Sequence, residues 1–281
     1  RAVKVIRCEM LERQRLEAWA GAYPPVRTPK RVLVVMAGNI PLVGFFDLLC
    51  VLASGHACRV KPSSKDTVLI GYVVDLLRTI DPAIPLRMAE QGERPDAVIA
   101  TGSDNANRYF RMLFGGIPSL LRGSRQSVAV LSGRETAAEL SGLEEDIFAY
   151  SGLGCRNVSL LFLPRGYMPE LRCTALNEKY RRNYLRERAL LRMRRMPFVD
   201  LDGAVLCEDR SFPAALSRIH YTFYDSLADV EAWLAAHDDR LQCVVSQCVR
   251  HSRRVAFGRA QHPGLTDYAD DVDTMQFLGT I

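Results

Sequence analysis

The stretch VLVVMAGNIP, residues 32–41, decides the fold class. Its first six residues are apolar and include three β-branched valines. This composition is typical of a strand that is buried on both faces of a parallel sheet. Gly38 then provides a tight turn, and residues 42–54 have the pattern of a helix. Strand, glycine turn and helix form the βα unit of nucleotide-binding folds, although Gly38 and Gly44 do not complete the G-x-G-x-x-G fingerprint.

Three more strand-like runs follow this unit, at residues 57–60, 96–100 and 127–131. Each run ends at polar or glycine-containing turn residues, and helical patterns follow the first two at 67–80 and 106–114. Strands that alternate with helices predict an α/β fold with a parallel sheet. We therefore expect four βα-type units in one Rossmann-like sheet that binds a dinucleotide.

Two groups of residues are candidates for cofactor binding, because open α/β sheets bind ligands at the carboxyl ends of their strands. Lys61 ends the second strand-like run, and Ser63 follows it. Lys61 could bind a cofactor there, or it could be an ordinary solvated lysine. Thr101, Gly102 and Ser103 precede a helix, where backbone N–H groups and hydroxyls can bind a phosphate. A plain helix cap is the alternative for this second group.

Cys155 is the candidate nucleophile. It follows two glycines in the segment GLGCRNVS, residues 152–159, and glycine allows the backbone to approach a ligand closely. A buried structural cysteine is the alternative, since cysteine is among the most buried residue types. Asn39, at the end of the first strand, could direct its side-chain amide at a developing oxyanion. It could also be a simple turn or N-cap residue.

The second half of the chain has the pattern of another α/β lobe. An acidic helix-like stretch at 135–150 leads to Cys155, and residues 158–163 have the pattern of a helix or a strand. Later runs predict a strand, a helix and a strand at 218–224, 226–237 and 241–245. We predict three regions: a cofactor-binding domain at 1–134, a catalytic domain at 135–250, and a C-terminal segment at 251–281 that returns to the domain interface.

Residues 177–196 form a predicted basic amphipathic helix with seven arginines. A solvated face is the simplest interpretation of such a charge run. The alternatives are a site for the anionic tail of a ligand or for an acidic partner protein.

Composition excludes several classes of protein. The chain has 281 residues, 48% of them hydrophobic, and a net charge of +5, which is too small to indicate nucleic-acid binding. Its eight cysteines contain no CxxC and its five histidines no HxxxH, so we expect no zinc and no disulfide framework. The acidic stretch 267–273 lacks the EF-hand spacing, so no metal is expected. No signal peptide or apolar span is visible, which favours a cytoplasmic protein, and we expect the N-terminus to be trimmed.

Taken together, four segments resemble the acyl-CoA reductases of the LuxC type, the fatty-acid reductase branch of the aldehyde dehydrogenase superfamily. The resemblance covers residues 32–278 and is carried by GNIPLVG (38–44), IATGS (99–103), GLGCRNVS (152–159) and the tail 267–278. It implies an aldehyde-dehydrogenase-like fold with a Rossmann-like cofactor domain and a second α/β catalytic domain.

The resemblance also implies a reaction and its residues. Cys155 matches the thiol that attacks an acyl-CoA thioester, and Asn39 matches the amide that stabilises the oxyanion. Lys61 matches a lysine on the adenosine ribose of NAD(P), and Gly102 with Ser103 matches the pyrophosphate site. Reduction by NADPH would release a fatty aldehyde. The choice of NADPH rests on this resemblance, with NADH as the alternative, and Lys61, Lys65 and Ser63 could accept a 2′-phosphate.

One departure from the hydrolytic aldehyde dehydrogenases bears on the reaction. In VLSG, residues 130–133, Val130 stands where those enzymes carry a water-activating glutamate. The lack of a base would protect an acyl-thioenzyme from water. A helix N-terminus at Cys155 could lower the pKa of the thiol, and Arg156 is a second candidate for that role.

Two other functions are alternatives to the long-chain reductase. They are a short-chain CoA-acylating aldehyde dehydrogenase and a non-catalytic scaffold subunit. Expected partners are acyl-CoA, a second copy of the chain, and a protein that donates the acyl group or accepts the aldehyde.

Overall fold

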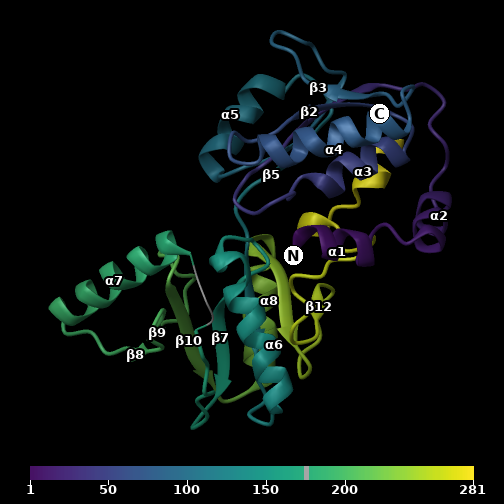
Figure 1. The fold of residues 1–281 in the computed structure, drawn as a ribbon. Coiled ribbons are helices and arrows are strands. Elements are labelled where there is room, and N and C mark those ends of the chain that lie inside the picture. The colour runs from purple at the N-terminus through teal and green to yellow at the C-terminus, as the bar shows by residue number, and fades with distance from the viewer. Residues whose placement is uncertain (174–176) are drawn as a thin grey trace. The chain divides into compact units, whose positions relative to one another are not determined.

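The computed structural model describes residues 1–173 and 177–281. The chain divides into two compact units, each built on its own sheet (Figure 1). Unit 1 comprises Arg1–Ser124 and Gly264–Ile281, and unit 2 comprises Arg125–Pro263. The α/β class predicted from the sequence is confirmed by one parallel and one mixed sheet, both packed with helices.

Sheet A of unit 1 has five parallel strands in the order β3-β2-β1-β4-β5. The alternating pattern of β1 directs Val32 and Val34 to one face, where they are fully buried, while Leu33 on the other face is partly exposed. The strands are β1 (Arg31–Val35), β2 (Ala57–Lys61), β3 (Leu86–Met88), β4 (Ala97–Thr101) and β5 (Ser119–Arg122).

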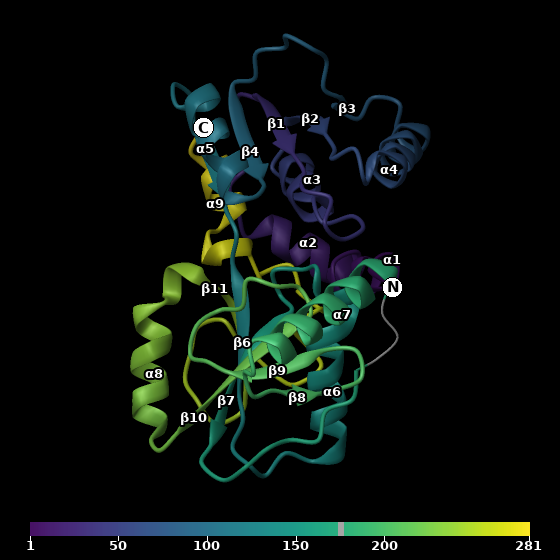
Figure 2. The same cartoon turned by 90° about the vertical axis from the view of Figure 1, so that its left-hand side faces the viewer.

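Helices α3 (Phe45–Ala53) and α4 (Thr67–Ile80) cover the buried face of β1 and β2 (Figure 2). They follow β1 and β2 in the chain, as right-handed βαβ connections require. Helix α5 (Asp104–Phe114) connects β4 to β5. The connection from β3 to β4 is different, because residues 89–96, all of them described, contain no helix.

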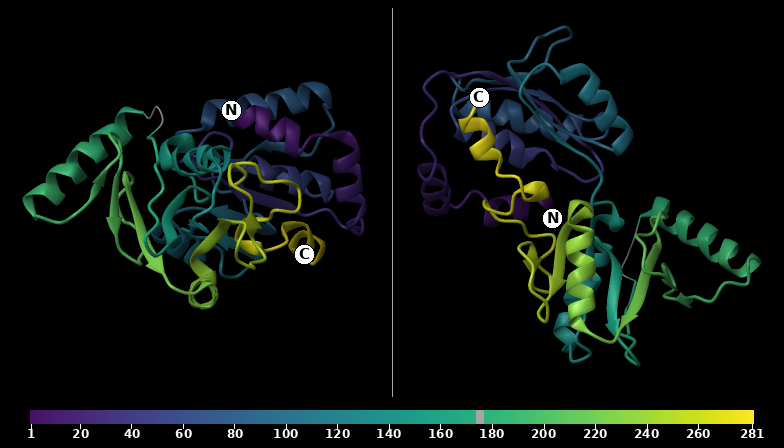
Figure 3. Two further views of the ribbon diagram at one scale, coloured as in Figure 1. Left: turned by 90° about the horizontal axis from the view of Figure 1, so that it is seen from below. Right: turned by 180° about the vertical axis from the view of Figure 1, so that it is seen from behind.

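The C-terminal segment packs on the N-terminal part of unit 1. Helix α9 (Thr274–Gly279) lies beside α3 (Figure 3). His56 is fully buried and connects the segment before β1 with helix α9. Its Nδ1 accepts from the N–H of Lys30 at 2.9 Å, and its Nε2 lies 2.9 Å from the carbonyl oxygen of Leu278. The remaining N-terminal helices are α1 (Ala2–Glu9) and α2 (Arg13–Gly21).

A buried ion pair closes the same region. Arg122, at the end of β5, donates to Asp47 of α3 at 2.6 Å and to the hydroxyl of Thr274 at 2.7 Å. Burial lowers the pKa of Arg122, but the Asp47 carboxylate outweighs that effect and raises it. One guanidinium therefore links a strand, an early helix and the last helix of the chain.

Sheet B of unit 2 has seven strands in the order β12-β11-β6-β7-β10-β9-β8, and only β8 is antiparallel to its neighbour. The strands are β6 (Gln126–Val130), β7 (Val158–Pro164), β8 (Val199–Asp200), β9 (Val205–Glu208), β10 (Arg218–Tyr224), β11 (Leu241–Ser246) and β12 (Arg254–Val255).

Helices α6 (Ala137–Phe148) and α8 (Leu227–Ala236) cover opposite faces of sheet B. Leu161 and Leu163 of β7 pack in the cluster that holds α6, whereas Leu160 and Phe162 pack in the cluster that holds α8. This alternation is the period of two expected for a strand that is covered on both faces. Helix α7 (Glu178–Met193) packs against β9.

Several predicted boundaries differ from the structure. The run at 127–131, predicted as a fourth strand of the cofactor domain, is β6 of sheet B, because its neighbours are β7 and β11. The units accordingly divide after Ser124 rather than at 134, and residues 264–281 group with unit 1. Residues 2–21 form two helices, α1 and α2, separated at Met10–Glu12, and β3, β5, β8, β9 and β12 were not predicted.

Val130 ends β6 in the middle of sheet B and is fully buried between β7 and β11. Its side chain packs in the apolar cluster that holds α8. The position is therefore a core position in this chain, and the correspondence of Val130 to a water-activating glutamate stays a prediction.

Within residues 1–173 and 177–281, no helix is both long enough and apolar enough to cross a membrane.

Two glycines in helices test how tightly this fold is packed. A Cβ at Gly142 of α6 would lie 2.8 Å from the backbone nitrogen of Gly258 and 2.9 Å from the carbonyl carbon of Phe257. Gly142→Ala should therefore destabilise the protein by about 1–3 kcal/mol, because the backbone of residues 257 and 258 cannot move aside as a flexible side chain can.

Gly71 is the matched control. A Cβ at Gly71 of α4 would meet no atom within 4 Å, so Gly71→Ala should stabilise the protein by about 1 kcal/mol through helix propensity. Urea denaturation measures both, and equal effects would contradict the close packing at Gly142.

Candidate active site

The carboxyl ends of β2, β1 and β4 place the predicted cofactor residues along one edge of sheet A. Val35, the last residue of β1, pairs with Lys61 on one side and with Ala100 on the other. Lys61 is exposed, and its carbonyl oxygen accepts from the N–H of Met36 at 3.0 Å. Lys61 and Thr101 therefore flank the end of the central strand, as the sheet order requires.

The loop after β1 carries Asn39, which is exposed. Gly38 lies so close to the segment after β2 that a Cβ there would be 2.4 Å from Oγ of Ser63. Further along the loop, Leu42 adopts a left-handed conformation with φ of 58°. Its N–H donates to the buried carboxylate of Asp66 at 2.7 Å. Asp66 thus fixes the Asn39 loop to the start of α4, and the sequence alone did not indicate this role.

At the next strand end, Ser103 caps helix α5: its hydroxyl oxygen accepts from the N–H of Ala106 at 3.3 Å. The cap interpretation therefore describes the Ser103 side chain, while a phosphate role for it stays a prediction. Gly102 is required sterically, because a Cβ would lie 2.9 Å from the Cβ of Ala106. The N–H of Gly102 is already used, since it donates to the carbonyl of Arg122 at 3.1 Å.

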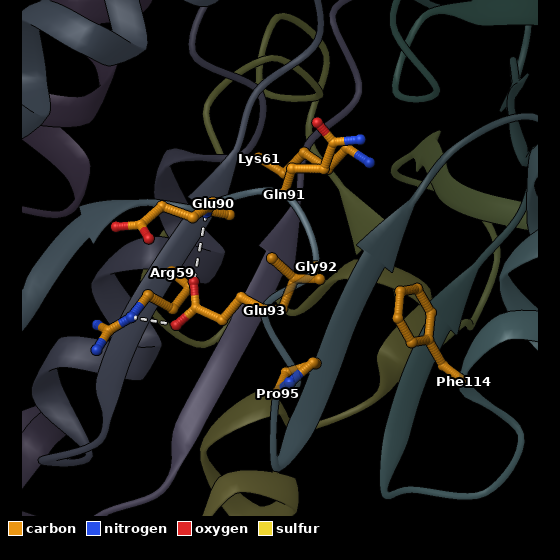
Figure 4. A pocket seen from close by; sticks show the side chains of 10 residues that line it. Arg59, Lys61, Glu90, Gln91, Gly92, Glu93, Pro95 and Phe114 are labelled. Carbon is orange, nitrogen blue, oxygen red and sulfur yellow. Dashed lines mark hydrogen bonds and ion pairs between the residues drawn. The ribbon is translucent and has the colours of Figure 1, made fainter.

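A cavity of about 480 Å³ adjoins Lys61 on the face of sheet A that α3 and α4 do not cover (Figure 4). It lies against β1 and β2 where the connection from β3 to β4 has no helix. Phe114 contributes an aromatic ring from the end of α5. The lining residues are Leu33, Arg59, Lys61, Ala89, Glu90, Gln91, Gly92, Glu93, Pro95 and Phe114.

An ion pair forms one wall of this cavity. Nε of Arg59 donates to Glu93 at 3.0 Å, and Arg87 donates to the same carboxylate oxygen at 3.0 Å. Partial burial raises the pKa of Glu93, but the backbone N–H of Glu90 and these guanidinium groups lower it below its usual value. The wall therefore combines a fixed carboxylate with cationic groups, and Lys61 adds an exposed ammonium.

In unit 2, Cys155 is exposed and lies in a turn directly before β7. The approach from α6 is unusual, because Tyr150, Ser151 and Gly152 have φ values of 51°, 55° and 65°. Three successive left-handed residues, two of them not glycine, are a costly conformation that the surroundings must enforce. The expectation of a helix N-terminus at Cys155 is wrong, since a strand follows the turn.

The buried side chain of Asn157 enforces this conformation. Its Nδ2 donates to the carbonyls of Asp146 and Ile147 at 3.1 Å each and to that of Ala149 at 2.9 Å. Its Oδ1 accepts from the N–H of Gly154 at 2.8 Å. The amide therefore satisfies the carbonyls at the end of α6, which have no helical partner, and closes the turn that presents the thiol.

A hydroxyl supports the other side of the turn. Ser127 on β6 is fully buried, and its Oγ donates to the carbonyl of Cys155 at 2.9 Å. The same oxygen accepts from the N–H of Cys243 at 3.2 Å. These bonds fix the backbone of Cys155 and leave its side chain at the surface.

Burial disfavours the thiolate form of most of the other cysteines. Burial raises the pKa of Cys243 to about 11 and that of Cys173 to about 11. Burial likewise raises the pKa values of Cys50, Cys58 and Cys207. Because the thiolate is the attacking form, burial disfavours these five. Among the remaining three, only Cys155 lies in a glycine-rich turn.

Cys155 belongs to unit 2 and Asn39 to unit 1, so their cooperation stays a prediction. No group of His, Cys, Asp or Glu in the described part of the chain could hold a metal ion.

No model of a known protein family matches the sequence, and no curated protein matches it either. Solved structures do match, and several of them are aldehyde dehydrogenases. A putative aldehyde dehydrogenase from Burkholderia cenocepacia superposes with a TM-score of 0.60 at 17% identity, over 85% of this chain and 66% of that one. The chain has the aldehyde dehydrogenase fold.

Two further structures with the aldehyde dehydrogenase fold agree. The Mycobacterium tuberculosis aldehyde dehydrogenase in complex with NAD+ gives a TM-score of 0.57 at 17% identity, over 72% of this chain and 53% of that one. The substrate-bound Staphylococcus aureus AldH gives 0.56 at 17% identity, over 90% and 67%. The chain thus spans about half to two thirds of the length of these enzymes, and the likeness establishes the fold.

Asn157 gives a direct test of the thiol turn. In Asn157→Asp the donor amide becomes a carboxylate that faces three carbonyl oxygens, so stability should fall by about 1–3 kcal/mol. The rate at which Cys155 is alkylated should change with it, as measured by mass spectrometry of labelled peptides.

Asn183→Asp is the matched control. The Asn183 amide donates to the carbonyl of Lys179 at 2.8 Å on the surface of α7, so its loss should cost less than about 0.5 kcal/mol. If both variants behave alike, Asn157 does not hold the turn.

Proposed function

We propose that the protein reduces a long-chain fatty acyl-CoA to the fatty aldehyde with NADPH, through an acyl-thioester on Cys155. The observation that carries the proposal is an exposed thiol held in a rigid glycine-rich turn of a chain with the aldehyde dehydrogenase fold. The resemblance of the four sequence segments to LuxC-type acyl-CoA reductases supports the choice of substrate.

The thiol chemistry balances without a strong base. The Cys155 thiolate attacks the thioester carbon, the carbon–sulfur bond to CoA breaks, and CoA leaves as a thiolate. One thioester replaces another, so the acyl group moves with little change in free energy. When bound, NADPH supplies the hydride that reduces the acyl carbon. The resulting oxyanion collapses, the bond to Cys155 breaks, and aldehyde leaves as the thiolate is restored.

Asn39 has the chemistry of an oxyanion donor. Its side chain is exposed on a loop that Asp66 fixes and that packs on Ser63. A donor amide that is oriented in advance stabilises both oxyanions of the reaction, that of acylation and that of reduction.

The cofactor residues proposed from the sequence are Lys61, Ser63, Thr101, Gly102 and Ser103. The cavity beside Lys61 supports a nucleotide role, because its lining combines an aromatic ring, the exposed Lys61 ammonium and the Arg59–Glu93 ion pair. Lys61 and Ser63 would bind the adenosine end of NADPH, and a 2′-phosphate would find the Lys61 ammonium there.

NAD-dependent oxidation of an aldehyde is the second candidate, because one of the matched structures is an aldehyde dehydrogenase complexed with NAD+. The first experiment separates the two. Purified protein with tetradecanoyl-CoA and NADPH should show decay of nicotinamide absorbance, which Cys155→Ser abolishes and Cys8→Ser retains. Cys8 is the other exposed thiol among the described residues. Turnover of aldehyde with NAD+ and none with acyl-CoA would reverse the assignment, and no turnover in either direction would favour a non-catalytic subunit.

Asn39 and Lys61 should separate turnover from cofactor binding. Asn39→Ala should lower kcat by about 100- to 1000-fold and leave NADPH binding unchanged, while Asn183→Ala changes neither.

Lys61→Ala should weaken NADPH binding by about 10- to 100-fold, because one charge-assisted contact is lost. Lys4→Ala, which removes another exposed lysine, should leave NADPH binding unchanged. Fluorescence titration measures NADPH binding, and initial-rate assays at saturating substrate measure kcat. Loss of NADPH binding in Asn39→Ala would remove it from the oxyanion site.

A further inference from the structure

The charge of the protein is concentrated in one helix. Residues 178–196 contain eight basic and two acidic residues, a net charge of +6, while the whole chain has a net charge of +5. The rest of the chain is therefore nearly neutral, at −1. This distribution gives unit 2 a strongly basic element, α7 with the residues that follow it.

The inward face of α7 is fully accounted for by packing. Tyr180, Tyr184 and Leu191 are buried, and Tyr184 donates to Asp200 at 2.7 Å. The buried Glu187 accepts from Arg218 of β10 at 2.6 Å. These contacts hold α7 on sheet B, so its opposite face is presented in a fixed orientation.

The outward face combines an apolar line with flanking arginines. Leu185, Met193 and Met196 are 50%, 80% and 46% exposed, and Ala189 stands between the first two. Positions 185, 189 and 193 are four residues apart, so they form one line along the helix. With 100° per residue, Arg181 and Arg192 lie on one side of the arc that these positions span and Arg186 lies on the other, while Arg182 lies within the arc.

Of the seven arginines in residues 178–196, four carry a charge that no acidic side chain among the described residues compensates. Arg182 pairs with Glu178, Arg186 with Glu187 and Arg188 with Asp200. By contrast, the exposed guanidinium groups at 181, 192, 194 and 195 have no partner in the described residues. Three of these four lie at the end of the helix, beside Met193 and Met196.

We propose that the outer face of α7 docks on an anionic phospholipid surface. An apolar line flanked on both sides by cations is the arrangement of a helix that lies in the plane of a membrane interface. The methionines and Leu185 would enter the boundary of the acyl chains, and the arginines would meet lipid phosphates. An acidic protein would match the arginines but would need a separate apolar pocket for these side chains, whereas an anionic bilayer offers both. The inference does not depend on the proposed reaction.

Vesicle flotation with the full chain tests the docking. Protein should float with phosphatidylcholine vesicles that contain phosphatidylglycerol, weakly with phosphatidylcholine alone, and less as salt rises. The triple variant Arg192→Gln, Arg194→Gln, Arg195→Gln should lower the partition coefficient about 100-fold, at roughly fivefold per arginine near an anionic surface. Met193→Gln, made with all the arginines kept, should also lower the partition coefficient relative to the wild-type protein, because the apolar contact is lost.

The control is a second triple, Arg15→Gln, Arg27→Gln, Arg78→Gln, which removes the same charge from exposed positions of unit 1. It should retain flotation, and circular dichroism confirms that both triples are folded. Equal binding to neutral and anionic vesicles, or equal losses in the two triples, would overturn the proposal. So would tight binding to poly-glutamate without flotation, which would assign the face to an acidic protein. Acyl-CoA reductase activity is not a readout here, so the two proposals fail independently.

Discussion

The buried guanidinium of Arg122 is the interaction on which unit 1 depends. It is 3% exposed, and its contacts of 2.6 Å to Asp47 and 2.7 Å to Thr274 join β5, α3 and α9. A buried charge is tolerated only where a partner of opposite charge and good geometry meets it, and removal of one partner typically costs about 3–5 kcal/mol. Because Thr274 lies 152 residues after Arg122 in the chain, this contact makes the C-terminal segment part of the unit that carries Lys61.

A comparable constraint operates at the candidate nucleophile. The helix α6 must end, the chain must reverse, and a strand must begin within a few residues of Cys155. The three left-handed residues that achieve this would be strained in isolation. The Asn157 amide and the Ser127 hydroxyl supply the hydrogen bonds that compensate, so the thiol can be exposed while its backbone is rigid. Reactive side chains are commonly presented in this way, by a loop on a fixed scaffold.

The two proposals use different parts of the molecule for different physical tasks. The strand ends and the Cys155 turn offer precise, hydrogen-bonded positions that suit bond-making chemistry. The outer face of α7 offers unpaired charge and exposed apolar side chains, which suit a broad and fluid surface better than a small ligand. A long-chain aldehyde partitions into lipid, so a reductase that works beside a bilayer would release its product where that product is soluble.

The sequence by itself determined the α/β class, the positions of the longer elements such as α4 and β10, and the glycine turn at Cys155, because periodicity and turn chemistry act over a few residues. The tertiary structure alone decided which sheet β6 joins, why Asn157 and Asp66 matter, and that Val130 is buried. Parallel strands find their partners across long stretches of chain, and Ser127 lies 116 residues from Cys243. Such pairings are selected by the packing of whole sheets and leave no local signal. The two-residue strands β8 and β12 are too short to have a period of their own.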